Sequence, residues 1–229
     1  MEYGIILTTN ADGWKIGKRA EELGFDSIWF EDSQMVVADP FIAMATTAME
    51  TKKIRLGTGV CIPSNRIPPS TANMLATINQ LAPGRVNWGV GTGFSGRRAM
   101  GLAAIKIKDF GDYIGAVRGL LDREIVEWEF EGQRRKIKFL NPERDLFNTT
   151  DPIHFHVAAM GPRGRDLTAS HDSHWIHLYS TPDQAELDLK EMNAAYAEAG
   201  RDPANYRKTA FTLGAVVRDG DTYDTPRVR

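Results

Sequence analysis

Short apolar runs alternate with longer stretches of helical periodicity along the chain, and this order constrains the fold more than any other feature. The runs typical of strands are residues 4–9, 27–30, 53–62, 85–91, 153–160, 175–180 and 209–217. The helical patterns are residues 13–25, 39–51, 70–82, 108–121, 163–171 and 182–200. Strand–helix alternation of this length predicts an α/β fold in which helices cover a parallel sheet.

An open doubly wound sheet and a (β/α)8 TIM barrel both fit this order. Seven strands with no break half-way favour the barrel, which typically needs about 250 residues. We expect one domain spanning residues 1–229, in which the eighth βα unit after 209–217 is missing. The sequence therefore predicts a barrel with a shortened C-terminus.

Residues 125–150 break the strand–helix order. Apolar and polar residues alternate there around Gly132-Gln133, a pattern typical of two antiparallel strands joined by a turn. We expect a β-hairpin insertion, which is either simply solvated or part of a lid or subunit contact.

The composition excludes several classes of partner. A net charge of -2 gives no electrostatic attraction for nucleic acid or for an anionic membrane surface. The single cysteine, Cys61, excludes an internal disulfide framework and suits a reducing compartment. No run approaches the roughly 18 apolar residues of a membrane span, and the N-terminus lacks the features of a signal peptide. We therefore expect a cytoplasmic protein.

In a barrel the site lies at the carboxyl ends of the strands, which here are rich in Gly, Ser, Thr and Asn. Such small residues suit a large flat cofactor with a phosphate tail better than a metal or a carboxylate pair. "AAMGPRG" (158–164) ends a strand and opens a helix, where free amides and Arg163 favour phosphate. An ordinary turn with a surface arginine explains the same residues. The glycines of "GVGTG" (89–93) are weaker evidence of a phosphate.

Five segments resemble the luciferase-like monooxygenase family, in the family's order, especially the branch with deazaflavin-dependent methylenetetrahydromethanopterin reductase. They are residues 20–34, 39–60, 67–93, 157–167 and 199–203. The resemblance implies a bacterial luciferase-like TIM barrel with redox chemistry on reduced flavin mononucleotide (FMN) or on the 8-hydroxy-5-deazaflavin coenzyme. It also implies a homodimer.

The resemblance places cofactor contacts at the ends of three strands. Those implied are Thr58, Gly59, Asn65, Gly91, Thr92, Gly93, Ala159, Met160, Gly161, Pro162 and Arg163, with the phosphate at 161–163 and the glycines opposite. In this branch the stretch matching 57–60 carries a non-proline cis peptide, which we place at Gly59-Val60. Met160 could instead serve only in packing. Asn65 and its neighbour Arg66 could instead belong to a salt bridge in the loop.

Three residues are candidates for catalysis: Asp32, Ser33 and His177. Deazaflavin-dependent dehydrogenases of the family carry Asp-His where this chain has Asp32-Ser33. Because Ser33 has no activator visible in the sequence, the alcohol dehydrogenase activity is disfavoured. Asp32 either positions the ring or substrate or serves as a cap or salt-bridge carboxylate. His177 is the histidine nearest the expected active end.

No metal site is expected among the histidines. His174 and His177 fall on opposite faces of a strand, so they cannot share a metal. His154 and His156 share a face, but near the start of their strand, away from the catalytic end.

The first functional hypothesis is a monooxygenase that acts on a small organic substrate with reduced FMN from a separate flavin reductase. The second is a deazaflavin-dependent reductase that passes hydride to an organic acceptor without oxygen. The third is a non-catalytic flavin-binding homologue.

Overall fold

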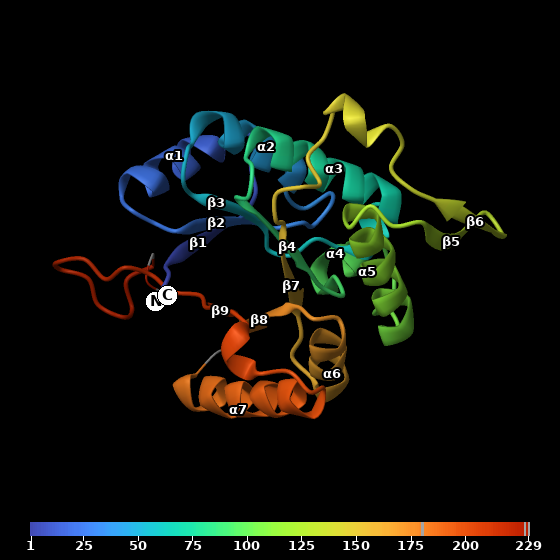
Figure 1. Cartoon of the computed structure of the whole chain (residues 1–229). Coiled ribbons are helices and arrows are strands. Elements are labelled where there is room, and N and C mark those ends of the chain that lie inside the picture. The colour runs from blue at the N-terminus through green and yellow to red at the C-terminus, as the bar shows by residue number, and fades with distance from the viewer. Residues whose placement is uncertain (180, 227, 229) are drawn as a thin grey trace.

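Seven parallel strands form a nearly closed barrel with helices outside it (Figure 1). The structure is a computed structural model that describes residues 1–179, 181–226 and 228. Neighbours in the sheet follow one another in the order β1 (Gly4–Leu7), β2 (Ser27–Phe30), β3 (Arg55–Thr58), β4 (Val86–Val90), β7 (His154–Ala158), β8 (His174–Leu178) and β9 (Lys208–Phe211). The predicted α/β barrel is confirmed, and the doubly wound alternative is excluded by this order.

The helices cover the outside of the barrel. They are α1 (Trp14–Glu22), α2 (Pro40–Glu50), α3 (Pro68–Leu81), α4 (Phe94–Ala99), α5 (Ile107–Leu121), α6 (Pro162–Ser170) and α7 (Pro182–Glu198). Short 3-10 turns occupy Pro63–Asn65, Pro142–Arg144 and Pro203–Asn205. Gly24 and Gly200 take positive φ angles of 84° and 71° just past α1 and α7, as helix-ending glycines do. The short helix α4 is not predicted by the sequence analysis.

Most strands are shorter than predicted. β3 stops at Thr58, where the chain begins to pack across the glycines of β4, and β9 stops at Phe211 instead of continuing to 217. The last bond along β9 runs from the Tyr179 N–H to the Phe211 carbonyl, and Leu213 beyond it is exposed. Residue 180 of the predicted strand 175–180 lies outside the described residues.

The predicted insertion is a hairpin of β5 (Val126–Phe130) and β6 (Gln133–Ile137), which projects from the body beyond α5 (Figure 1). Its turn is Glu131-Gly132, one residue earlier than predicted. Both residues take positive φ angles, 54° and 69°, which is the requirement of a two-residue type I′ turn. Gln133 instead pairs with Phe130 inside the ladder.

The interior of the barrel is filled by side chains below the carboxyl ends of the strands. A Cβ on Gly57 would lie 2.4 Å from the ring of Trp29, so the indole occupies the space that a larger residue would need. The same indole meets His156 edge-on at 5.2 Å and Phe211 at 5.5 Å. Since this level is packed by Trp29, His156 and Phe211, a ligand inside the barrel would have to bind at the carboxyl ends of the strands, which we call the mouth.

Candidate active site

The chain after β3 runs close beside the glycine-rich end of β4. The peptide bond between Gly59 and Val60 is cis, as predicted. A Cβ on three alternate glycines would collide with this segment: at Gly89 with the Thr58 carbonyl (2.2 Å), at Gly91 with Val60 (2.6 Å) and at Gly93 with Ile62 (2.3 Å). The glycines of "GVGTG" are therefore explained by the close approach of the bulged chain.

This packing joins the ends of three strands. A Cβ on Gly91 would also lie 3.3 Å from the Cβ of Ala158 at the end of β7. The Thr58 hydroxyl is already used, since it donates to the Gly89 carbonyl at 2.7 Å. The predicted cofactor residues at the ends of β3, β4 and β7 thus lie together, and the contact of each of them with a cofactor stays a prediction.

Asp32 is the centre of a buried network behind the mouth. Its carboxylate is 4% exposed and accepts hydrogen bonds from the Ile62 N–H (3.0 Å), Asn65 Nδ2 (3.0 Å) and Arg66 (2.8 Å). Arg66 continues to Asp39, which caps α2. Burial opposes the charge of Arg66, but the two carboxylates raise its pKa above the usual value. Asp32 therefore holds the loop after β3 in place. This agrees with the second of its two expected roles, that of a salt-bridge carboxylate.

Ser33 faces a second hydroxyl and no base. Its Oγ lies 2.8 Å from Ser95 Oγ on α4, and Gln34 Nε2 donates to the Gly96 carbonyl at 2.7 Å. These bonds fix α4 against the loop after β2. The contacts described for Ser33 therefore give it no means of taking a proton. The oxygen atoms Gln34 Oε1 and Asn65 Oδ1 are buried without a hydrogen-bond partner in the described chain.

The loop from β7 to α6 has the features of an anion site. Gly161 is the N-cap of α6, and no side chain caps this end. The N–H groups of Gly161 and Arg163 donate no hydrogen bond to any described residue. Arg163 is exposed and takes part in none of the ion pairs found among the described residues. Free amides beside an unpaired guanidinium suit a phosphate.

His177 is turned away from the barrel interior, toward α7. Its ring stacks on Trp175 at 4.8 Å, and its Nε2 lies 2.8 Å from Asp188 Oδ2, although the N–H is not aimed well enough for a hydrogen bond. Its Nδ1 lies 3.1 Å from the Met160 sulfur. Burial lowers the pKa of His177 despite the carboxylate of Asp188. The structure does not bring His177 to Asp32 and Ser33.

The other strand histidines lie inside the barrel. His174 faces His156 at 4.9 Å, so His174 and His177 occupy opposite faces, as predicted. Burial holds the pKa of His156 well below its usual value. Within the ranges the structure describes, no three His, Cys, Asp or Glu side chains are grouped to hold a metal ion.

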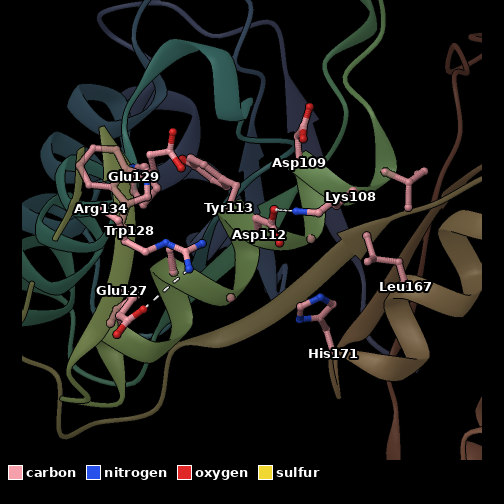
Figure 2. Close-up of a pocket in the computed structure, with 16 residues that line it drawn as sticks. Lys108, Asp109, Asp112, Tyr113, Glu127, Trp128, Glu129, Arg134, Leu167 and His171 are labelled. Carbon is pink, nitrogen blue, oxygen red and sulfur yellow. Dashed lines mark hydrogen bonds and ion pairs between the residues drawn. The ribbon is translucent and has the colours of Figure 1, made fainter. Parts of the chain in front are cut away.

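A groove of about 870 Å³ lies elsewhere, between α5, the hairpin and the end of α6 (Figure 2). Its charged residues are largely paired, Lys108 with Asp112 at 2.5 Å and Glu127 with Arg134 at 3.8 Å. No predicted site residue lines this groove. We therefore place the candidate site at the mouth.

Two sets of residues around the candidate site are not predicted from the sequence. One is Ser95 on α4, which gives no signal because the helix is too short for periodicity. The other is the pair Arg165 and Asp188, which face inward from α6 and α7. Asp188 could have been found from helical periodicity, because it is a charged residue on the same face of α7 as buried Met192 and Tyr196.

The fold and the mouth define a parallel α/β barrel with a bulged third strand beside an uncapped helix. The family model described as luciferase-like monooxygenase matches residues 9–222, and the chain belongs to this family. No helix in the described part of the chain is long and apolar enough to cross a membrane.

Two curated relatives and one solved structure illustrate the similarity. A 5,10-methylenetetrahydromethanopterin reductase of Methanolobus tindarius is 29% identical over 96% of this chain and 67% of its own length. An F420-dependent hydroxymycolic acid dehydrogenase of Mycobacterium tuberculosis is 32% identical over 87% of this chain and 57% of its own. The monooxygenase RslO1 from Streptomyces bottropensis superposes with a TM-score of 0.80 at 23% identity, over 96% of this chain and 73% of that one. The chain thus spans about two thirds or less of the length of these curated relatives.

Proposed function

We propose that this chain is an oxidoreductase that binds a reduced flavin-type cofactor at the carboxyl ends of β3, β4 and β7. The observation that carries the proposal is the uncapped start of α6, with its free N–H groups, beside the strand ends of β3 and β4 that pack together through Val60 and Gly91. Membership of the luciferase-like monooxygenase family and the names of the relatives support the same class of chemistry.

The residues present fit such a cofactor. Gly161 has open space where a Cβ would stand, and its N–H and that of Arg163 lack acceptors in the described chain. These two amides and the Arg163 guanidinium would hold the phosphate, and the bulge would back the ring. When bound, the cofactor supplies a hydride or an electron pair from its reduced ring.

Asp32 and Ser33 position the loops at the mouth, and their described contacts give them no route for exchanging a proton. Asp32 is fully engaged with the loop after β3, and Ser33 has only another hydroxyl as partner. Removing the proton of an alcohol substrate needs a base, which these contacts do not provide. We therefore propose an acceptor that needs no such base, such as an imine-like carbon, or an organic substrate oxidised with oxygen.

The relatives change the order of the two cofactors. From the sequence alone, FMN and a monooxygenase come first. The curated relatives include a methylenetetrahydromethanopterin reductase and a dehydrogenase that depends on F420, the deazaflavin coenzyme, and their names favour this coenzyme and a reductase. The FMN-dependent monooxygenase is the second candidate, favoured by the description of the family. The separate flavin reductase, the homodimer and the cytoplasmic location stay predictions.

The test is a titration of the purified protein under nitrogen with reduced deazaflavin coenzyme and, separately, with reduced FMN. Tighter binding of the deazaflavin, with an acceptor reduced in the absence of oxygen, supports the reductase. Tighter binding of FMN, with oxygen consumed in proportion to product, supports the monooxygenase instead. A cofactor that binds without turnover supports the non-catalytic homologue, and binding of neither cofactor contradicts the proposed function.

A further inference from the structure

Buried side chains donate hydrogen bonds to Ala159 and Met160, the two residues that precede the proposed phosphate loop. The Trp175 Nε1–H donates to the Ala159 carbonyl at 2.8 Å. Arg165, 7% exposed, donates to the Met160 carbonyl, also at 2.8 Å. Both donors come from the layer between the barrel and its outer helices. Two consecutive carbonyls are thus held by buried donors immediately before the free N–H of Gly161.

Arg165 is in turn paired with two carboxylates of α7. Its guanidinium lies 3.7 Å from Asp188 Oδ1 and contacts the carboxylate of Glu191. Asp188 is 6% exposed, and its second oxygen approaches His177 at 2.8 Å. A buried charge left without its partner is costly, so Asp188 and Arg165 hold each other in one geometry. The proposed cofactor contacts involve neither residue.

The network of Trp175, Arg165 and Asp188 reaches Ala159 and Met160 from outside their own turn. Three elements, β8, α6 and α7, each contribute a polar buried side chain, and each chain of contacts ends at Ala159 or Met160. An anion site depends on the direction of its N–H groups, because misplaced donors lose most of their interaction with the ligand. Residues that fix the preceding carbonyls fix those donors too.

We propose that Asp188, Arg165 and Trp175 are positioning residues that set the preference of the site for a cofactor carrying a phosphate. This inference rests on the proposed function, because it assumes that residues 161–163 receive that phosphate. The network acts on the phosphate end alone, so binding of a ring without phosphate is independent of it. Each variant is expected to lose about tenfold in affinity for the phosphorylated cofactor, the fold-change that one charge-assisted hydrogen bond is worth.

The experiment compares FMN with riboflavin, which lacks the phosphate, and the deazaflavin coenzyme with its form lacking the phosphate-bearing tail. The readout is the ratio of the two dissociation constants under nitrogen for the wild-type protein, Asp188→Asn and Trp175→Phe. Trp175→Phe keeps the aromatic packing and removes one donor, so it decides the question if Asp188→Asn does not fold. Glu186→Gln, an exposed neutralisation on the same helix, is the matched control.

The ratio is the dissociation constant of the form without the phosphate divided by that of the form with it. We expect this ratio to fall about tenfold in folded variants and to stay at the wild-type value in Glu186→Gln. A purely structural role would weaken both members of each pair equally, and that result overturns the inference. If the wild-type protein prefers the phosphate and the variants keep that preference, only this inference fails. If the wild-type protein has no preference for the phosphate, the phosphate loop of the proposed function fails first and this inference with it.

Discussion

The side chain of Val60 occupies the place of a side chain on Gly91: a Cβ there would lie 2.6 Å from Val60 Cγ2. The Gly91→Ala variant should lose about 1–3 kcal/mol of unfolding free energy, because the bulge cannot retreat without disturbing the β3–β4 contact. Urea unfolding measures this loss. Val60→Ala in the same chain should recover most of it.

Gly115→Ala is the matched control for that prediction. Gly115 is exposed on α5, and a Cβ there meets nothing within 4 Å. The variant should be more stable by about 0.5–1 kcal/mol, since alanine is the better helix former. Equal stability of Gly91→Ala and the wild-type protein would show that the bulge is not packed as described.

The ion pair of Asp32 and Arg66 should stabilise the fold whether or not a cofactor binds. Asp32→Ala leaves the Arg66 guanidinium, whose side chain is 13% exposed, without its inner partner, and should cost about 3 kcal/mol. Urea unfolding of the protein without cofactor tests this. Exposed Asp12→Ala, which breaks the surface pair with Lys15, should have a much smaller effect, because solvent screens an exposed ion pair. A similar small cost for Asp32→Ala would contradict the network.

The neutral His174 inside the barrel should make the fold sensitive to acid. Burial, with the nearby charge of Arg207, lowers the pKa of His174 to about 4. Because the unfolded pKa is higher, about 6.5, the unfolded chain binds more protons between the two values. The contribution of neutral His174 to the free energy of unfolding is therefore complete above about pH 6.5 and is lost as the pH falls toward about 4.

His174→Asn should reduce this acid sensitivity, since an amide oxygen can still accept the hydrogen bond from the Arg207 N–H. Urea unfolding at about pH 4.5 and about pH 7.5 should show a stability difference smaller by about 2 kcal/mol than in the wild-type protein. Buried His156 keeps the remaining sensitivity. An unchanged difference would contradict the assignment to His174.

Cys61, the single cysteine, should be unreactive in the folded protein. Burial raises the pKa of its thiol to about 12, helped by the carboxylate of Asp32. Since the thiolate is the reactive form, iodoacetamide should label the chain only after unfolding. Mass spectrometry with and without denaturant measures this, and rapid labelling of the folded protein would contradict the buried position.

The sequence predicts the barrel well because its elements follow hydrophobic periodicity and breaker residues. β2 has its predicted bounds, 27–30, and Gly24 and Gly200 end their helices as expected. Strand ends are less predictable because they depend on partners: β9 stops at Phe211 where its bond with β8 ends. The face of His177 could have been read from Trp175, since residues two apart in a strand share a face.

The site is only partly predictable for the same reason. The location of the cis peptide follows from the family resemblance, but the reason for the glycines at 89–93 does not. Their spacing fits a phosphate loop and a crossing backbone equally, and only the contacts of Val60 and Ile62 distinguish the two. The inward charges Arg165 and Asp188 give a signal in helical periodicity, whereas their meeting point is a product of tertiary packing.

The most direct test of the central claim is the affinity of Arg163→Ala for the reduced cofactor that the wild-type protein binds. Arg163 is exposed and makes no ion pair within the described chain, so the variant should fold with unchanged stability. If residues 161–163 bind the phosphate, the affinity of Arg163→Ala should be about tenfold lower than that of the wild-type protein and of Arg134→Ala, which changes an exposed arginine on the hairpin. An affinity equal to the wild-type value would contradict a phosphate at 161–163.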